Sequence, residues 1–103
     1  MKVPFPYTDK ATRQRRPALV VSAPQLAEAQ GLVWVLMITS AENLAWSGDV
    51  AITALVRAGL PVASVIRTAK IATIEVRDTE PLGEVTPAVL AAVRRHLAQQ
   101  VLA

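Results

Sequence analysis

The side chains best suited to chemistry in this sequence form a cluster of cations close to the N-terminus. Lys10, Arg13, Arg15 and Arg16 fall within seven residues, and Arg16 directly precedes Pro17. A guanidinium binds phosphate through a planar fork of N–H groups and keeps its charge when it is partly desolvated. Such a cluster is typical of a phosphate-binding loop, although the same charges also occur on loops that only interact with water.

Two neighbouring hydroxyl residues, Thr39 and Ser40, stand at the end of the most apolar run of the chain, residues 32–39. Functional groups are often placed where a rigid strand meets a loop. The Thr39 hydroxyl is able to hold a phosphate oxygen or a ribose 2′-hydroxyl, and Ser40 is able to add a second contact. The alternative is that these residues only cap the strand, and for Ser40 this alternative is the stronger one.

The composition excludes several classes of site. The 103 residues include no cysteine and one histidine, His96, which excludes disulfides, iron–sulfur ligation, thiol catalysis and a two-histidine ribonuclease site. We expect no metal and no cofactor. The longest apolar run, residues 32–38, is too short for the roughly 20 residues that span a bilayer. The lack of cysteine and of an apolar leader fits a protein of the reducing cytoplasm, which is the expected location.

Short apolar runs separated by turn residues predict one mainly β domain over residues 1–103. Residues 4–17 contain three prolines and are predicted to form a loop. Strands are predicted at residues 18–22, 32–39, 49–55, 62–68 and 70–76, with Ala69 as a bend or bulge between the last two. The run 32–39 is apolar on both faces, so it should be the buried central strand.

Two helices are predicted beside these strands. Ser22 is expected to cap a short helix that has Pro24 in its first turn and ends at Gly31. Thr86 and Pro87 are expected to open a C-terminal helix with one apolar side for packing on the sheet, made of Val89, Leu90, Val93, Leu97 and Val101. The expected fold is therefore α+β, a curved antiparallel sheet or partly open barrel with a short helix and a C-terminal helix packed on it.

The two tryptophans lie in different sequence surroundings. Trp34 is inside the apolar run and is expected in the core. Trp46 is in a polar loop, where a place in the core or at a subunit interface is favoured and stacking on a nucleobase is the alternative.

Three ordered stretches of sequence extend over nearly the whole chain. The first is VPFPYTD at residues 3–9 followed by RRPALVVS at 15–22, and the second is MITS at 37–40. The third consists of GDV at 48–50, GLP at 59–61, SVIR at 64–67 and KI at 70–71. None of these pieces is specific by itself. In this order and spacing they resemble the MazF/PemK toxin family, and specifically its PemK-like branch.

The resemblance implies an SH3-like barrel and the toxin of a type II toxin–antitoxin system. It implies an endoribonuclease that cuts single-stranded RNA such as mRNA at selected sequences without a metal. The ribose 2′-hydroxyl attacks the adjacent phosphorus and leaves a 2′,3′-cyclic phosphate and a 5′-hydroxyl, so DNA is resistant. It also implies a homodimer with RNA across the dimer groove, and an antitoxin that inserts an acidic C-terminal segment into the same groove.

The resemblance also assigns catalytic residues. Arg16 matches a catalytic arginine that acts on the phosphate, and Thr39 matches a threonine that the family uses. The alternatives for Arg16 are that it only neutralises RNA phosphates, or that it forms a structural ion pair with Asp9.

The expected RNA-binding residues are Arg13, Arg15, Ser40, Arg67 and Lys70. Arg67 matches an arginine that contacts RNA in the family, and Lys70 is expected to join it. The alternative for Arg67 is a solvent-facing ion pair with Glu75 or Asp49, which would contribute little stability.

Two features depart from the family pattern. Some members carry a carboxylate at the position of Ala69 and others at the position of Ala11, and this chain has neither. Catalysis therefore relies on Arg16 and Thr39 with water, or Asp9 replaces the carboxylate, or activity is low. The first strand of the family is expected to be mostly missing or to lie upstream, because only Met1 and Lys2 precede VPFPYTD. Its neighbour would then have an open edge that a partner can cover.

The absent carboxylates keep two other functions open. One is a non-catalytic relative that acts by binding a protein target such as a topoisomerase. The other is a degenerate toxin that only binds RNA or its antitoxin.

Overall fold

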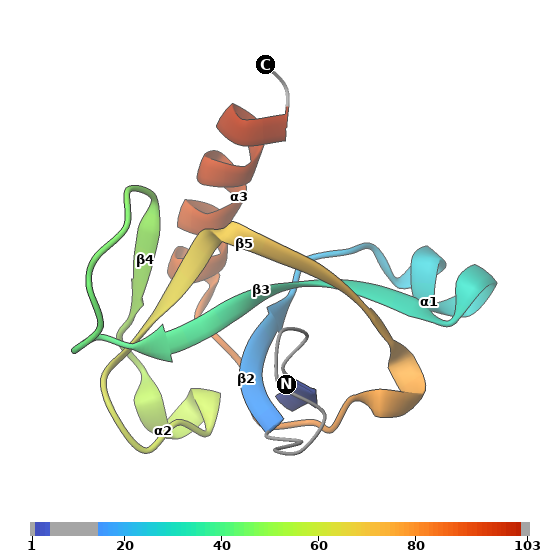
Figure 1. The fold of residues 1–103 in the computed structure, drawn as a ribbon, viewed down its shortest axis with the longest axis horizontal. Coiled ribbons are helices and arrows are strands. Elements are labelled where there is room, and N and C mark those ends of the chain that lie inside the picture. The colour runs from blue at the N-terminus through green and yellow to red at the C-terminus, as the bar shows by residue number, and fades with distance from the viewer. Residues whose placement is uncertain (1, 5–14, 102–103) are drawn as a thin grey trace.

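The computed structural model describes residues 2–4 and 15–101, which contain a five-stranded antiparallel sheet. Its strands are β1 (Lys2–Pro4), β2 (Arg15–Val20), β3 (Leu32–Ser40), β4 (Asp49–Ile52) and β5 (Ser64–Glu75). They are arranged in the order β1-β2-β3-β5-β4, and the curved sheet stays open instead of closing into a barrel (Figure 1). The predicted α+β fold with a curved antiparallel sheet is confirmed.

Strand β3 is central because both of its faces pack against other elements. Successive residues of a strand point to opposite faces. Leu36 and Ile38 join the larger hydrophobic core, to which Val93 of the C-terminal helix α3 (Pro87–Val101) also belongs. The smaller core contains Val33, Val35 and Met37. Full burial of one such side chain contributes about 1.5–3 kcal/mol, so this strand anchors both layers.

Strand β5 runs unbroken past the point where a bend was predicted. Residues 62–68 and 70–76 were expected to form two strands, whereas β5 is one strand of 12 residues. Its pairing with β3 is nevertheless irregular. Leu36 lies opposite Ile71 and Ile38 lies opposite Ile66, so β3 advances two residues while β5 advances five. The extra residues of β5 include Ala69, so the predicted bulge is present without ending the strand.

The prediction of a loop at residues 4–17 is wrong at both of its ends, because Pro4 belongs to β1 and residues 15–17 belong to β2. β2 begins at Arg15, and its residues 15–17 pair with β1, where Pro17 lies opposite Lys2. Proline fixes φ near −65°, which lies within the β region, so it removes one donor without preventing an extended backbone. The edge of β2 that was expected to be open is thus partly covered, because the short strand β1 pairs with its residues 15–17.

The short helix α1 (Pro24–Gln30) and its end at Gly31 are confirmed, but its predicted cap is not. Gly31 has φ 67°, the left-handed conformation that favours glycine. The N-cap residue is Ala23, and no side chain caps this end. The Ser22 hydroxyl instead accepts a hydrogen bond from the Trp34 backbone N–H at 3.0 Å, because Ser22 follows β2 and faces the neighbouring strand.

The C-terminal helix α3 is confirmed, with one exception at its end. The Thr86 hydroxyl accepts a hydrogen bond from the Val89 N–H at 3.3 Å, as expected of a cap. Val89 and Val93 are buried and Leu97 packs beside them, whereas Val101 is 70% exposed. Figure 1 shows why: the helix extends beyond the sheet at its C-terminal end.

The predicted strand at residues 49–55 ends at Ile52, and the chain then forms α2 (Leu55–Ala58). A 3-10 turn, η1 (Val76–Asp78), follows β5. Gly59 ends α2 with φ 72°. No helix within residues 2–4 and 15–101 is long and apolar enough to cross a membrane.

We expect Gly59→Ala to destabilise the fold far more than Gly31→Ala. Both glycines have positive φ, which costs a residue with a side chain roughly 1–2 kcal/mol. A Cβ at Gly59 would collide with the backbone carbonyl of Leu82, whereas a Cβ at Gly31 meets nothing within 4 Å. Urea unfolding followed by circular dichroism should show a loss of about 3 kcal/mol or more for Gly59→Ala. Equal losses for the two variants would contradict the close approach at Gly59.

Candidate active site

Three adjacent strands bring four of the predicted site residues around one small cavity of about 90 Å³. Arg16 comes from β2, Thr39 from the end of β3, and Arg67 and Lys70 from β5. Ala18 lies opposite Met37 in the β2–β3 pairing, and continuing this register places Arg16 beside Thr39. The β5 irregularity lies at residues 67–70 and so brings its two cations to the same place.

A larger cavity of about 300 Å³ adjoins the first and shares Arg16, Ile38 and Thr39 with it. Ser40 lines this second cavity, together with mostly apolar residues: Pro17, Gly59, Leu60, Pro61, Val62, Ser64 and Leu82. The two cavities therefore combine a cationic part and an apolar part on either side of Arg16 and Thr39. Five of the seven predicted site residues lie around them.

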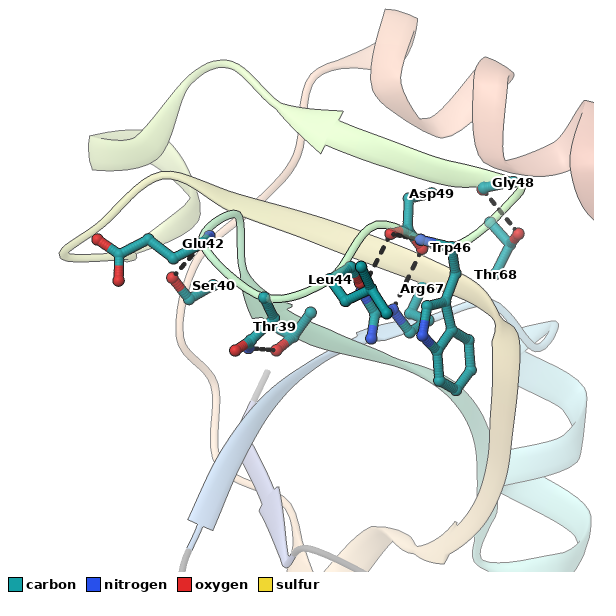
Figure 2. A network of polar contacts seen from close by, with 10 residues as sticks. Thr39, Ser40, Glu42, Leu44, Trp46, Gly48, Asp49, Arg67 and Thr68 are labelled. Carbon is teal, nitrogen blue, oxygen red and sulfur yellow. Dashed lines mark hydrogen bonds and ion pairs between the residues drawn. The ribbon is translucent and has the colours of Figure 1, made fainter.

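The guanidinium of Arg67 is held by the loop between β3 and β4 and by β4 itself. Its Nη2 donates to the carbonyl of Leu44 at 2.7 Å and to Asp49 Oδ2 at 3.1 Å, and its Nε donates to Asp49 Oδ1 at 3.3 Å (Figure 2). Arg67 and Asp49 are register partners in β5 and β4. Arg67 is only 8% exposed.

The expected alternative for Arg67, an ion pair with Asp49, is present, but it is buried and not solvent-facing. Glu75 pairs instead with Arg77 at 2.7 Å. The contacts of Arg67 use three of its five N–H groups, and Nη1 carries the other two. The ion pair thus fixes a guanidinium that still lines the cavity.

The hydroxyls of Thr39 and Ser40 both accept hydrogen bonds from the loop after β3. Asn43 Nδ2 donates to Thr39 Oγ1, and the Glu42 backbone N–H donates to Ser40 Oγ at 3.3 Å (Figure 2). A hydroxyl that accepts from the protein still has its own proton to donate. The loop therefore orients both hydroxyls as possible donors, and the Ser40 contact also matches the capping alternative.

Neither tryptophan is in the core, which contradicts the expectation for Trp34 and the core interpretation of Trp46. Trp34 is 48% exposed beside Ile71 and Thr73, because only one face of β3 packs at this end of the strand. Trp46 is 40% exposed, and the Arg67 guanidinium carbon lies 4.3 Å from its ring centroid.

Other predicted residues fall outside the described part of the structure or away from the cavities. Arg13, Asp9 and Ala11 lie outside the described residues, and Arg15 is described only as the backbone start of β2. Ala69 is exposed on β5. None of the described residues that line the two cavities is acidic, and no group of three His, Asp or Glu in the described ranges could hold a metal ion.

Sequence reasoning missed two residues that organise this site. Asn43 orients Thr39 from a polar loop, and nothing in the local pattern marks it. Asp49 was considered only as a surface partner, although its place in GDV, at the start of a strand, was a signal for a fixed position.

Removing the charge of Asp49 should destabilise the protein, because Arg67 would stay buried without its partner. We expect Asp49→Asn to lower the free energy of unfolding by about 3 kcal/mol. The matched control is Glu84→Gln, which removes an exposed ion pair with Arg57 and should cost less than about 1 kcal/mol. Urea unfolding compares the two variants, and similar small losses would mean that the buried pair does not hold the site together.

Comparisons with known proteins identify the family to which this chain belongs. The family model of PemK-like, MazF-like toxins of type II toxin–antitoxin systems matches residues 1–101. The structure is similar to MazF from Deinococcus radiodurans, with 27% identity, a TM-score of 0.76, and coverage of 99% of this chain and 91% of that chain. It is similar to a MazE–MazF complex from the same organism, with 27% identity, a TM-score of 0.74, and coverage of 97% and 88%.

A third similar structure is an endoribonuclease from a mycobacterial species, with 25% identity, a TM-score of 0.65, and coverage of 82% of this chain and 77% of that chain. A comparison with curated protein sequences gave no match. The match of the family model over residues 1–101 shows that the chain belongs to the PemK-like, MazF-like toxins of type II toxin–antitoxin systems.

Proposed function

We propose that this toxin is a metal-independent endoribonuclease that cuts single-stranded RNA, mRNA included, at selected sequences. The observation that carries the proposal is the convergence of Arg16, Thr39, Arg67 and Lys70 on one cavity. Three cations and a hydroxyl form a site for a phosphodiester, whose negative charge increases in the transition state. The likeness to an endoribonuclease supports the same function.

In the proposed reaction the ribose 2′-hydroxyl attacks the adjacent phosphorus. The 2′-oxygen–phosphorus bond forms, the bond from phosphorus to the 5′-oxygen breaks, and the products are a 2′,3′-cyclic phosphate and a 5′-hydroxyl. Arg16 contacts the phosphate oxygens through its fork of N–H groups and stabilises the extra charge of the phosphorane. Thr39 donates a hydrogen bond from its hydroxyl to a phosphate oxygen, and Arg67 and Lys70 add positive charge.

The proton of the 2′-hydroxyl passes to water in this proposal, because the described lining of the cavities holds no carboxylate. A water molecule likewise supplies the proton that the leaving 5′-oxygen takes up, so the 5′-hydroxyl is formed without a net change in protons. Asp9, outside the described residues, is the other acceptor that the sequence offers. The rate enhancement then comes mainly from charge stabilisation and orientation. DNA, which has no 2′-hydroxyl, is not a substrate.

The proposal extends to partners and location. Arg13, Arg15 and Ser40 would bind further parts of the RNA, and two copies of the chain would form a homodimer with RNA across their groove. An acidic C-terminal segment of the antitoxin would occupy that groove, and the MazE–MazF complexes support an antitoxin partner. The protein would act in the cytoplasm, where mRNA is its substrate.

Arg16→Ala should abolish RNA cleavage while the fold survives, because the phosphorane loses its guanidinium. The measurement incubates purified protein with a long single-stranded RNA in excess EDTA and maps the new ends. We expect discrete cuts with 5′-hydroxyl ends from wild type. The matched control is Arg94→Ala, which removes the same charge from an exposed position on α3 and should cut normally.

Cleavage at the normal rate by Arg16→Ala would refute the assigned role of Arg16. A folded wild-type protein that makes no cuts would instead favour a toxin that only binds RNA, its antitoxin or a protein target. The absence of a carboxylate from the described cavity lining would then be the physical reason.

Replacing the Thr39 hydroxyl should slow the chemical step. Thr39→Val keeps the shape of the side chain but removes its donor, and the loss of one such donor lowers kcat by roughly 10²-fold. Thr39→Ser keeps the hydroxyl and should retain most of the rate. Single-turnover cleavage assays compare the two, and equal rates for Thr39→Val and wild type would assign Thr39 to strand capping alone.

A further inference from the structure

The indole ring of Trp46 lies against both cations that β5 contributes to the small cavity. The Arg67 guanidinium carbon is 4.3 Å from the ring centroid and the Lys70 ammonium nitrogen is 5.4 Å from it. Both residues also line the cavity. The two side chains that contact the ring are therefore the same ones that are proposed to bind phosphate.

The position of Trp46 is fixed by its neighbours. Its backbone N–H donates to Asp49 Oδ2 at 2.9 Å, and its carbonyl accepts from the Asp49 N–H at 3.2 Å (Figure 2). Asp49 and Arg67 are held in turn by their buried ion pair. A backbone that is already held in place loses little conformational entropy when a ligand binds to the side chain that it carries.

Trp46 also keeps a large open surface. It is 40% exposed even with Arg67 and Lys70 against it, which for a large aromatic side chain corresponds to about 100 Å². This open surface is available for contact with a ligand.

We propose that the open surface of Trp46 is a stacking platform for one nucleobase of a bound single-stranded RNA. The proposal rests on the proposed function and adds a residue that contacts a base. A nucleic acid strand alternates phosphates and bases, and here a group of cations adjoins an aromatic ring. Every base has a π-face that stacks on an aromatic ring, so the platform tolerates sequence variation. Specificity for single strands follows, because the bases of a duplex are already stacked on one another.

The second tryptophan provides an internal control. Trp34 is similarly exposed, at 48%, but it lies beside Ile71, Ala72 and Thr73, none of which is charged. The sequence contains only these two tryptophans. The substitution Trp34→Phe therefore leaves Trp46 as the sole source of indole fluorescence.

The first test titrates the Trp34→Phe protein with two probes. One is a 2′-O-methyl single strand of mixed sequence, which cannot be cut, and the other is a strand of the same length without bases. We expect the first probe to quench Trp46 fluorescence, and the abasic probe to bind through its charge without quenching. A base-containing strand that binds without changing Trp46 fluorescence would overturn the proposal.

The second test separates stacking from support of the loop. Loss of one stacked base lowers affinity by about 5- to 150-fold, so Trp46→Leu should lose this factor for the base-containing strand and nothing for the abasic strand. Trp46→Phe, which keeps a ring, should retain most of the affinity, and Trp34→Leu should bind both strands as wild type does. If Trp46→Leu weakened both strands equally, Trp46 would only be positioning Arg67.

The outcomes separate a failure of the stacking platform from a failure of the proposed function. A wild-type protein that cuts RNA, with Trp46→Leu binding it unchanged, overturns only the stacking platform. A wild-type protein that neither binds nor cuts RNA overturns both. Quenching of Trp46 by an acidic polypeptide but not by the base-containing strand would show that the occupant is a protein, and this result would also overturn the platform.

Discussion

The arrangement around the cavity depends on one buried ion pair, between Arg67 of β5 and Asp49 of β4. Burying two charges is costly, and such a pair is tolerated only when the remaining hydrogen-bonding groups are satisfied. Here the Asp49 carboxylate accepts from Arg67 and from the Trp46 N–H, while Arg67 also donates to the carbonyl of Leu44. The pair therefore ties β4, β5 and the loop between β3 and β4 into one unit.

This unit explains how a loop without regular structure holds a defined position beside the cavity. The loop at residues 41–48 is anchored at Leu44 and Trp46 by the ion pair, and at its start by Ala41, whose N–H donates to the Ala63 carbonyl at 2.9 Å. Asn43 lies between these anchors and orients the Thr39 hydroxyl. A change at Asp49 would therefore alter the position of Thr39 as well as that of Arg67, although Asp49 lines neither cavity.

The irregular pairing of β3 and β5 has a comparable effect. In a regular ladder, residues of one strand alternate strictly between two faces, so Arg67 and Lys70 would point to opposite sides. The extra residues of β5 between Ile66 and Ile71 change this relation and allow both cations to line one cavity. Irregularities of this kind are common next to functional sites because they redirect individual side chains.

The sequence alone determined the elements that depend on local chemistry and on one-dimensional patterns. The apolar run at residues 32–39 is the central strand, Gly31 ends α1, and Thr86 caps α3. Each of these features depends only on residues that are neighbours in the sequence: the apolar pattern of the strand, the left-handed φ of the glycine, and the capping hydroxyl of the threonine. The resemblance indicated Arg16, Thr39, Arg67 and Lys70 as a set, and the structure brings them together. Their roles in catalysis and RNA binding stay predictions.

Only the tertiary structure decided which residues meet across the sheet. Strand order and register place Arg67 against Asp49 in a buried position. They also leave Trp34 exposed and bring Trp46 beside two cations. The pairing of Pro17 with Lys2 likewise depends on a second strand that no local rule predicts. Contacts between residues distant in the chain are set by how complete elements pack, and the pattern of any one segment does not contain that information.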